Sequence, residues 1–187
     1  MAKKSVDVNA AAKASGSACS GLSSTQALAR FGDANWYFLA PQGSFEDGAD
    51  GWTTVTGEVT VVADAGYPDG PVPDTTSLQL APGAKVTSPP ICANSSTPSF
   101  RFFTKALAST AKGYAVEVTY LTQDGGAVKA SGSAVTGTSW APTPEFRVRT
   151  NKIALDRSGW GAIQISITAP SDSALRIDDL YVDPRMR

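Results

Sequence analysis

Apolar and polar residues alternate with a period of two along much of the chain after residue 43. Successive side chains of a β-strand point to opposite faces, so this alternation predicts strands with one apolar and one polar face. Such strands form antiparallel sheets that cover a core on one side and meet water on the other. The clearest segments are residues 58–61, 77–80, 100–102, 116–120 and 163–167.

Turn-forming residues separate these segments. Clusters of glycine, proline, aspartate and serine mark the breaks, because these residues supply the backbone angles or local hydrogen bonds that turns require. They occur at residues 68–70, 81–83, 124–126, 157–159 and 170–172. About nine short strands at this spacing, without a long helical period, predict an all-β antiparallel β-sandwich of jelly-roll type.

The first 42 residues differ from the rest. Residues 1–24 are rich in alanine, serine, glycine and lysine, and a segment of this kind buries little apolar surface by itself. Residues 24–30 predict one short helical turn, and the apolar cluster at 36–39 predicts packing on the domain. We therefore divide the chain into an N-terminal arm with its apolar lead-in, residues 1–42, and a sandwich, residues 43–187.

Two motifs at the ends of the sandwich resemble those of jelly-roll carbohydrate-binding modules. Residues 43–48 and Gly51-Trp52 resemble their opening pattern G-x-F-E-x-G…G-W, and residues 175–183 resemble their closing pattern I-D-D-hydrophobic. Residues 88–103 and the chain's ending also resemble a group of uncharacterised secreted actinobacterial proteins. The resemblance implies a secreted or cell-surface sandwich whose first and last strands lie side by side.

The closing segment changes phase. Leu175 and Ile177 share one parity, whereas Leu180 and Val182 share the other. One extra residue in a strand restores the apolar face after such a switch, so we predict a β-bulge at Asp178–Asp179.

The resemblance also implies a structural calcium ion where the first and last strands meet. Calcium takes six to eight oxygen ligands from carboxylates, backbone carbonyls and water. By that resemblance Glu46 and Asp179 are the side-chain ligands, and Asp178 is a weaker candidate. The alternative is that these acids cap turns or accept backbone N–H groups at the bulge.

The chain contains two cysteines, Cys19 and Cys92, with neither C-x-x-C nor zinc-site spacing. In an oxidising compartment they would pair, and in a cytosolic protein they would be buried thiols. Charged residues make up 18% of the chain, against about 25% in ordinary soluble domains. This composition favours the extracellular alternative, and therefore the disulfide.

Several function classes have no support in the sequence. The net charge is −1 with mixed signs, which gives no basic face for nucleic acid, and no apolar run is long enough to span a membrane. The chain has no histidine, and so lacks the commonest general base and the usual partner of a nucleophilic serine. It has no G-x-S-x-G or phosphate-loop motif, and its four glutamates form no marked pair. We therefore expect no enzymatic activity.

Two non-catalytic functions remain. The first is an extracellular structural or assembly module that associates with itself, or with another extracellular protein, through its N-terminal arm. The alternative is a module that recognises a polysaccharide or cell-wall glycan.

A glycan site needs exposed tryptophan or tyrosine rings, because the C–H faces of a sugar stack on aromatic planes. We predict Tyr67 and Trp140 as the ligand-binding rings and keep Trp52 and Trp160 as further candidates. For each ring the competing interpretation is packing against the domain.

Overall fold

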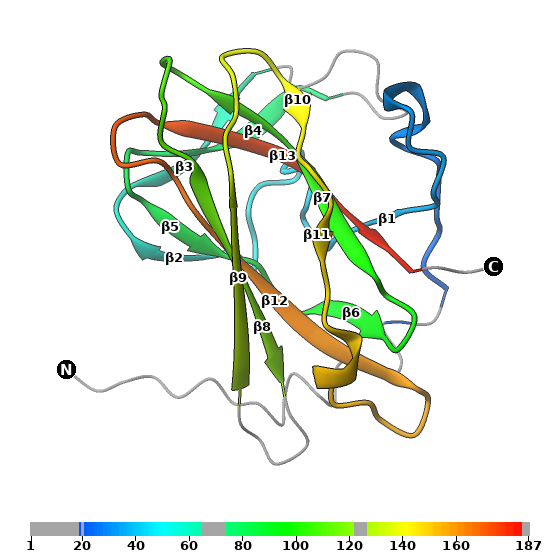
Figure 1. Cartoon of the computed structure of the whole chain (residues 1–187). Coiled ribbons are helices and arrows are strands. Elements are labelled where there is room, and N and C mark those ends of the chain that lie inside the picture. The colour runs from blue at the N-terminus through cyan, green and yellow to red at the C-terminus, as the bar shows by residue number, and fades with distance from the viewer. Residues whose placement is uncertain (1–18, 20, 65–73, 122–126, 185–187) are drawn as a thin grey trace.

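The chain forms a β-sandwich of two antiparallel sheets, and Figure 1 shows its strands from N- to C-terminus. This computed structural model describes residues 19, 21–64, 74–121 and 127–184. Within those residues it contains thirteen strands and two 3₁₀ helices, η1 and η2. The all-β antiparallel fold predicted from the alternation is confirmed. No helix in the described part has the length and apolar character that a membrane-spanning helix needs.

The first sheet has the strand order β10-β7-β13-β4-β3, with β1 beside β13 and β11 beside β7. Every pairing in it is antiparallel. Its strands are β1 (Phe38–Leu39), β3 (Val59–Ala63), β4 (Thr76–Leu80), β7 (Ser99–Ala106), β10 (Ala141–Pro142), β11 (Phe146–Arg147) and β13 (Leu175–Asp183).

The second sheet has the order β2-β5-β12-β8-β9, with β6 beside β12, and is also antiparallel throughout. Its strands are β2 (Thr53–Thr56), β5 (Lys85–Thr87), β6 (Ile91–Asn94), β8 (Tyr114–Leu121), β9 (Ala127–Ala134) and β12 (Trp160–Thr168). All five segments with the clearest alternation lie wholly or mostly within strands.

The core lies between the two sheets and follows the alternation of the sequence. In β12, Ile163, Ile165 and Ile167 are each fully buried, and their cross-strand partners Tyr120, Val118 and Val116 on β8 are buried with them. The first sheet contributes the opposite wall from β4, β7 and β13. The other parity of each strand therefore points away from the core.

The predicted bulge in β13 is confirmed. Asp178 is opposite Phe103 of β7 and Tyr181 is opposite Arg101, so three steps along β13 match two along β7. Asp179 takes a left-handed backbone conformation with φ of 47°. After the bulge Leu180 and Val182 face the core, where they are 2% and 0% exposed.

The beginning and end of the described chain lie side by side, as the resemblance implied. Strand β1 pairs with the end of β13, and Phe38 is opposite Val182. Leu180 also exchanges backbone hydrogen bonds with Ala40 and Gly43. The boundary that we placed after residue 42 thus falls within hydrogen-bonded structure.

The lead-in covers the outer side of the first sheet. Helix η1 (Ala29–Phe31) provides the predicted helical turn. A small cluster of Leu28, Tyr37, Phe103 and Tyr181 is buried beneath it. Arg101 of β7 donates a 2.8 Å hydrogen bond to Asp33 and fixes the lead-in to the sheet.

Cys19 and Cys92 form a disulfide across a Cα–Cα distance of 5.7 Å. It fastens the start of the described chain to β6 of the second sheet, and the predicted pairing is confirmed. Residues 1–18 of the arm lie outside the described residues.

Gly161 in β12 allows the segment after η2 (Thr150–Lys152) to pack directly on the strand. A methyl group at this position would clash with the backbone oxygen of Ala154 and the side chain of Ile153. Because a backbone atom cannot move aside as a side chain can, we expect Gly161→Ala to lower the free energy of unfolding by about 1–3 kcal/mol. Urea denaturation measures this loss.

The matched control is Gly137→Ala, because a methyl group at Gly137 meets nothing within 4 Å. It should leave the urea midpoint nearly unchanged. Equal midpoints for the two variants would contradict the close approach at Gly161.

Candidate functional site

The outer face of the second sheet is one candidate site, and we call it the polar face. Its residues are those of β5, β8, β9 and β12 that point away from the core. They are Lys85, Thr87, Ala115, Glu117, Thr119, Ala127, Lys129, Ser131, Ser133, Trp160, Ala162, Gln164, Ser166 and Thr168.

An ion-paired row crosses the polar face. Glu117 of β8 accepts hydrogen bonds from Lys129 of β9 at 2.8 Å and from Lys85 of β5 at 3.4 Å. The bond from Lys129, with help from the charge of Lys85, lowers the pKa of Glu117 below its ordinary value despite partial burial. The row therefore carries two cations and one anion at neutral pH. It gives the polar face several donors and acceptors in fixed positions.

Trp160 is the one aromatic residue among the described positions of the polar face. It begins β12 and is half-buried, opposite Asn94 of β6. Gln164 shares its outward parity, and the side-chain amide of Gln164 donates a hydrogen bond to the backbone oxygen of Ser88 at 3.2 Å. Trp160 is thus the one ring that the described residues of the polar face offer for stacking, and in the sequence it is only a further candidate.

The other predicted rings lie elsewhere. Trp140 is half-buried against the small cluster on the outer side of the first sheet, and the Lys105 ammonium lies 5.1 Å from its ring centroid. Trp52 packs 5.2 Å from the ring of Phe45 and donates to the backbone oxygen of Gln42. The structure thus places Trp140 and Trp160 on different sheets. Tyr67 lies outside the described residues.

The acids predicted as calcium ligands form a second candidate site, at the bulge of β13. Glu46 accepts hydrogen bonds from the backbone N–H groups of both Thr75 and Thr76, each at 2.8 Å, and from both hydroxyls. These bonds lower the pKa of Glu46 although burial acts in the opposite direction. Glu46 therefore fixes the start of β4 by accepting backbone N–H groups there, and not at the bulge of β13.

In contrast to Glu46, Asp178 and Asp179 have raised pKa values. Asp178 is 1% exposed. Burial, followed by the charges of Asp179 and Asp74, raises the pKa of Asp178 far above its ordinary value. Burial and the charge of Asp74 also raise the pKa of Asp179 to about 6. If all of its acids were ionised, the cluster would hold more negative charge than its surroundings neutralise, and the raised pKa values show that it takes up protons instead.

One carboxyl in this cluster is only partly satisfied by donors. The backbone N–H of Asp179 donates to Oδ1 of Asp178 at 2.8 Å, whereas Oδ2 of Asp178 is buried and accepts no bond from an N–H or hydroxyl group. The interaction of the Asp178 carboxyl with that of Asp74 contributes to its raised pKa. A buried carboxylate oxygen in this state takes either a proton or a cation. Within the described residues, no three acidic, histidine or cysteine side chains are arranged to hold a metal ion. A calcium ion here would thus need backbone carbonyls or water among its ligands.

Asp74 is a member of the bulge cluster that no sequence motif marks. Its charge raises the pKa of both bulge aspartates, yet it is about a hundred residues away from them in sequence. The only local signal is its position just before the strand that begins at Thr76. Its place in the cluster follows from the pairing of β4 with β13.

Solved structures share this fold. A family 16 carbohydrate-binding module has a TM-score of 0.53 at 19% identity, over 77% of this chain and 98% of that one. The fold is that of a carbohydrate-binding module. No protein-family model and no curated protein matches the sequence.

Two larger proteins contain a similar sandwich. Bacteriophage CBA120 tailspike protein 4, in its enzymatically active domain, has a TM-score of 0.55 at 18% identity over 76% of this chain. The Clostridium thermocellum endo-1,4-β-D-xylanase 10B modules, complexed with xylohexaose, have a TM-score of 0.58 at 15% identity over 81%. The chain spans 20% of the tailspike chain and 29% of the xylanase chain. At these identities the likeness establishes the fold.

The raised pKa values at the bulge make stability depend on pH. The folded chain holds protons on Asp178 and Asp179 above the pH at which an unfolded chain releases them. A folded state that binds more protons loses stability as pH rises. Asp33 and Asp64 have lowered pKa values, and their contribution is lost only as pH falls toward and below about 4.

Without divalent cations, we therefore expect the free energy of unfolding to fall as pH rises from 5 to 8. Asp178→Asn should remove most of this pH dependence. Urea denaturation across this range, at constant ionic strength, measures it. The control is Glu58→Gln. Glu58 is exposed and directly precedes β3, so this variant should keep the pH dependence of stability of the native chain. A native slope of zero, or an unchanged slope in Asp178→Asn, would contradict the assignment.

Proposed function

We propose that the chain is a secreted, non-catalytic module that binds a glycan on the polar face. The observation that carries the proposal is Trp160, the one described ring with outward parity among hydrogen-bonding side chains. The fold supports it, because the xylanase modules that are complexed with xylohexaose include a similar sandwich. The disulfide supports an extracellular location, since such bonds persist in oxidising compartments.

The polar face offers the two interactions that sugar recognition needs. Trp160 supplies a ring for the C–H face of one sugar residue. Gln164 and Thr119 lie opposite each other on β12 and β8, and Lys129 lies opposite Thr119 on β9. This row presents amide, hydroxyl and ammonium groups to the hydroxyls of the adjoining residues. The arrangement suits an extended chain that crosses the strands.

Two prominent acids, Asp178 and Glu117, lack the properties of a hydrolytic acid. A hydrolytic pair needs a carboxylic acid with a raised pKa that a substrate can reach. Asp178 has the raised pKa but is 1% exposed. Glu117 is accessible but is held ionised by two lysines. Neither acid meets both requirements.

Self-association through the N-terminal arm stays a prediction. Residues 1–18 lie outside the described residues, and the disulfide establishes only that the arm joins the sandwich beside β6. The glycan proposal has a described surface behind it, and we therefore give it precedence over assembly.

Trp160→Ala tests the glycan proposal. It should lower the affinity for a bound polysaccharide about tenfold or more, because stacked aromatic anchors dominate such interfaces. Pull-down with insoluble xylan, chitin and bacterial cell wall identifies the polysaccharide, and titration calorimetry with its soluble oligosaccharide gives the affinity. Xylohexaose is the first oligosaccharide to test.

The control is Trp140→Ala, which removes a ring from the other sheet and should keep the native affinity. Absence of binding by the native chain across all the glycans would contradict the proposal. Equal losses in the two variants would contradict the assignment to the polar face.

We also propose that a calcium ion neutralises the acids at the bulge, with Asp178 and Asp179 as side-chain ligands and Glu46 beside them. The supporting observation is the buried Oδ2 of Asp178, which faces a surplus of negative charge. When bound, calcium would keep both carboxylates ionised and join β13 to the loops that precede β2 and β4. Its role would be structural.

Calcium at 100 times its dissociation constant should stabilise the native chain by about 2.7 kcal/mol, and chelation with EDTA should reverse this. For a chain of this size, the melting temperature would shift by roughly 5–10 °C. Differential scanning calorimetry measures the shift, and Asp178→Asn should abolish most of it. A native melting temperature that is the same in calcium and in EDTA would show that a proton occupies the site instead.

A further inference from the structure

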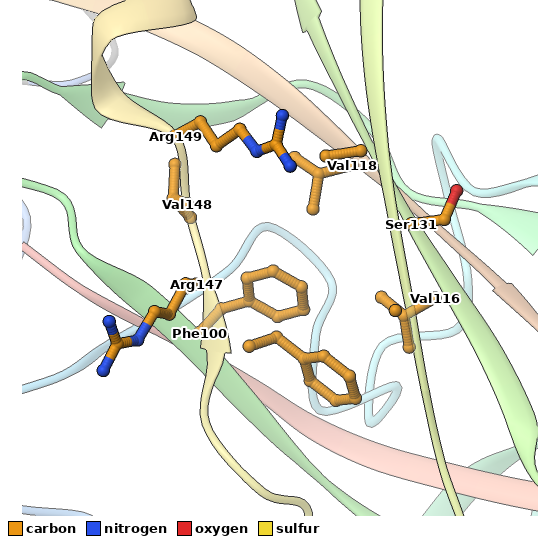
Figure 2. Close-up of a pocket in the computed structure, with 10 residues that line it drawn as sticks. Phe100, Val116, Val118, Ser131, Arg147, Val148 and Arg149 are labelled. Carbon is orange, nitrogen blue, oxygen red and sulfur yellow. The ribbon is translucent and has the colours of Figure 1, made fainter.

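A cavity of about 450 Å³ opens between the two sheets, and neither proposal above uses it. Figure 2 shows it between β9, the edge strand of the second sheet, and the segment that carries β11. Ten residues line it, and six of them are apolar: Phe100, Val116, Val118, Ala130, Phe146 and Val148. The volume falls within the range of small-molecule sites, which is about 300–1,000 Å³.

The floor of the cavity is the open side of the hydrophobic core. Val116 and Val118 are 2% and 4% exposed, so nearly all water is excluded from them. The rings of Phe100 and Phe146 are stacked, with centroids 5.5 Å apart and planes 20° from parallel. The ring of Phe146 packs close to Gly132 of β9, since a methyl group at Gly132 would lie in van der Waals contact with it at 3.5 Å. A flat apolar body would extend this aromatic stack.

The charge around the cavity has one sign. Arg147 and Arg149 are among its lining residues, and no acid is. Figure 2 shows the Arg149 side chain extending across the opening on the side of Val118, whereas Arg147 points away. No ion pair or side-chain hydrogen bond occupies the Arg149 guanidinium within the described residues.

A glycan does not suit this cavity. Its hydroxyl groups would lose water against valine and phenylalanine side chains and would find few partners there, which is unfavourable. A guanidinium presents a planar fork of donors that matches a carboxylate in a bidentate manner. The walls and the rim therefore select an apolar body that ends in an anion.

We propose that this cavity binds an aromatic carboxylate, with its ring against Phe100 and Phe146 and its carboxylate on Arg149. The cavity is distinct from most of the polar face, since its lining residues Ala130 and Gly132 have the opposite parity to Lys129 on β9; Ser131 at the rim belongs to both. The proposal does not depend on glycan binding and can fail or succeed independently of it.

The probe is 2-naphthoate, whose own fluorescence reports binding, and 2-naphthamide is its uncharged analogue. The native chain should bind naphthoate with saturation and at least tenfold more tightly than naphthamide. Arg149→Gln should remove this preference by weakening naphthoate binding about tenfold and leaving naphthamide unchanged. Arg157→Gln is the matched control and should keep the preference, because Arg157 is exposed and does not line the cavity.

A second pair of variants tests whether binding occurs in the cavity, and neither variant changes the charge of the protein. Ala130→Leu places extra methyl groups in the cavity from β9 and should abolish binding of both compounds. Ala115→Leu, on the exposed side of β8, is its control and should bind as the native chain does. Near-UV circular dichroism and the melting temperature confirm that each variant is folded. If Ala130→Leu does not fold, Val118→Phe replaces it, because Val118 lines the same cavity.

Three results would overturn the proposal. The first is no saturable binding of naphthoate by the native chain. The second is unchanged binding in a folded cavity-filling variant. The third is an equal effect of Arg149→Gln on naphthoate and naphthamide.

Discussion

The extra residue in β13 is the constraint on which the rest of the sandwich depends. This strand is central in its sheet, where it pairs with β7, β4 and β1. A regular strand could keep Leu175 and Ile177 in the core only by turning Leu180 and Val182 toward solvent. The bulge keeps all four side chains inside and bends the strand where β1 and the turn at Gly43 join it. Closure of the sandwich at its two chain ends follows from this one irregularity.

The same bulge explains why acids are buried. Left-handed backbone conformations favour glycine, asparagine and aspartate, and Asp179 occupies such a conformation. Its neighbour Asp178 is then buried close to the charges of Asp179 and Asp74. The local need for a short polar side chain thus creates an electrostatic problem in the tertiary structure, which a proton or a cation must solve. Raised pKa values at such a place mark a structural constraint as readily as a catalytic one.

The two candidate binding surfaces differ because they use opposite parities of the same strands. Residues of β8 and β9 that point outward are lysine, glutamate, serine and threonine, and they make a wet face suited to hydroxyl groups. Val116, Val118, Ala130 and Gly132 point inward from the same strands, and they line the cavity. The two faces of β8 and β9 at the edge of the sandwich are therefore polar on the outside and apolar on the inside. This difference follows from the alternation of polar and apolar residues along these strands.

The sequence by itself determined the features that depend on local order. The parity of Ile163–Ile167, the phase switch at Asp178–Asp179 and the possible partnership of two isolated cysteines are all visible in it, because period and spacing are properties of the chain. Only the tertiary structure decided which side chains from distant strands meet. It placed Asp74 beside Asp178, put Trp160 on the polar face while Trp140 packed against Lys105, and left the cavity beneath Arg149. Those outcomes depend on strand order and on where one sheet ends beside the other, and neither leaves a periodic signal in the residues concerned.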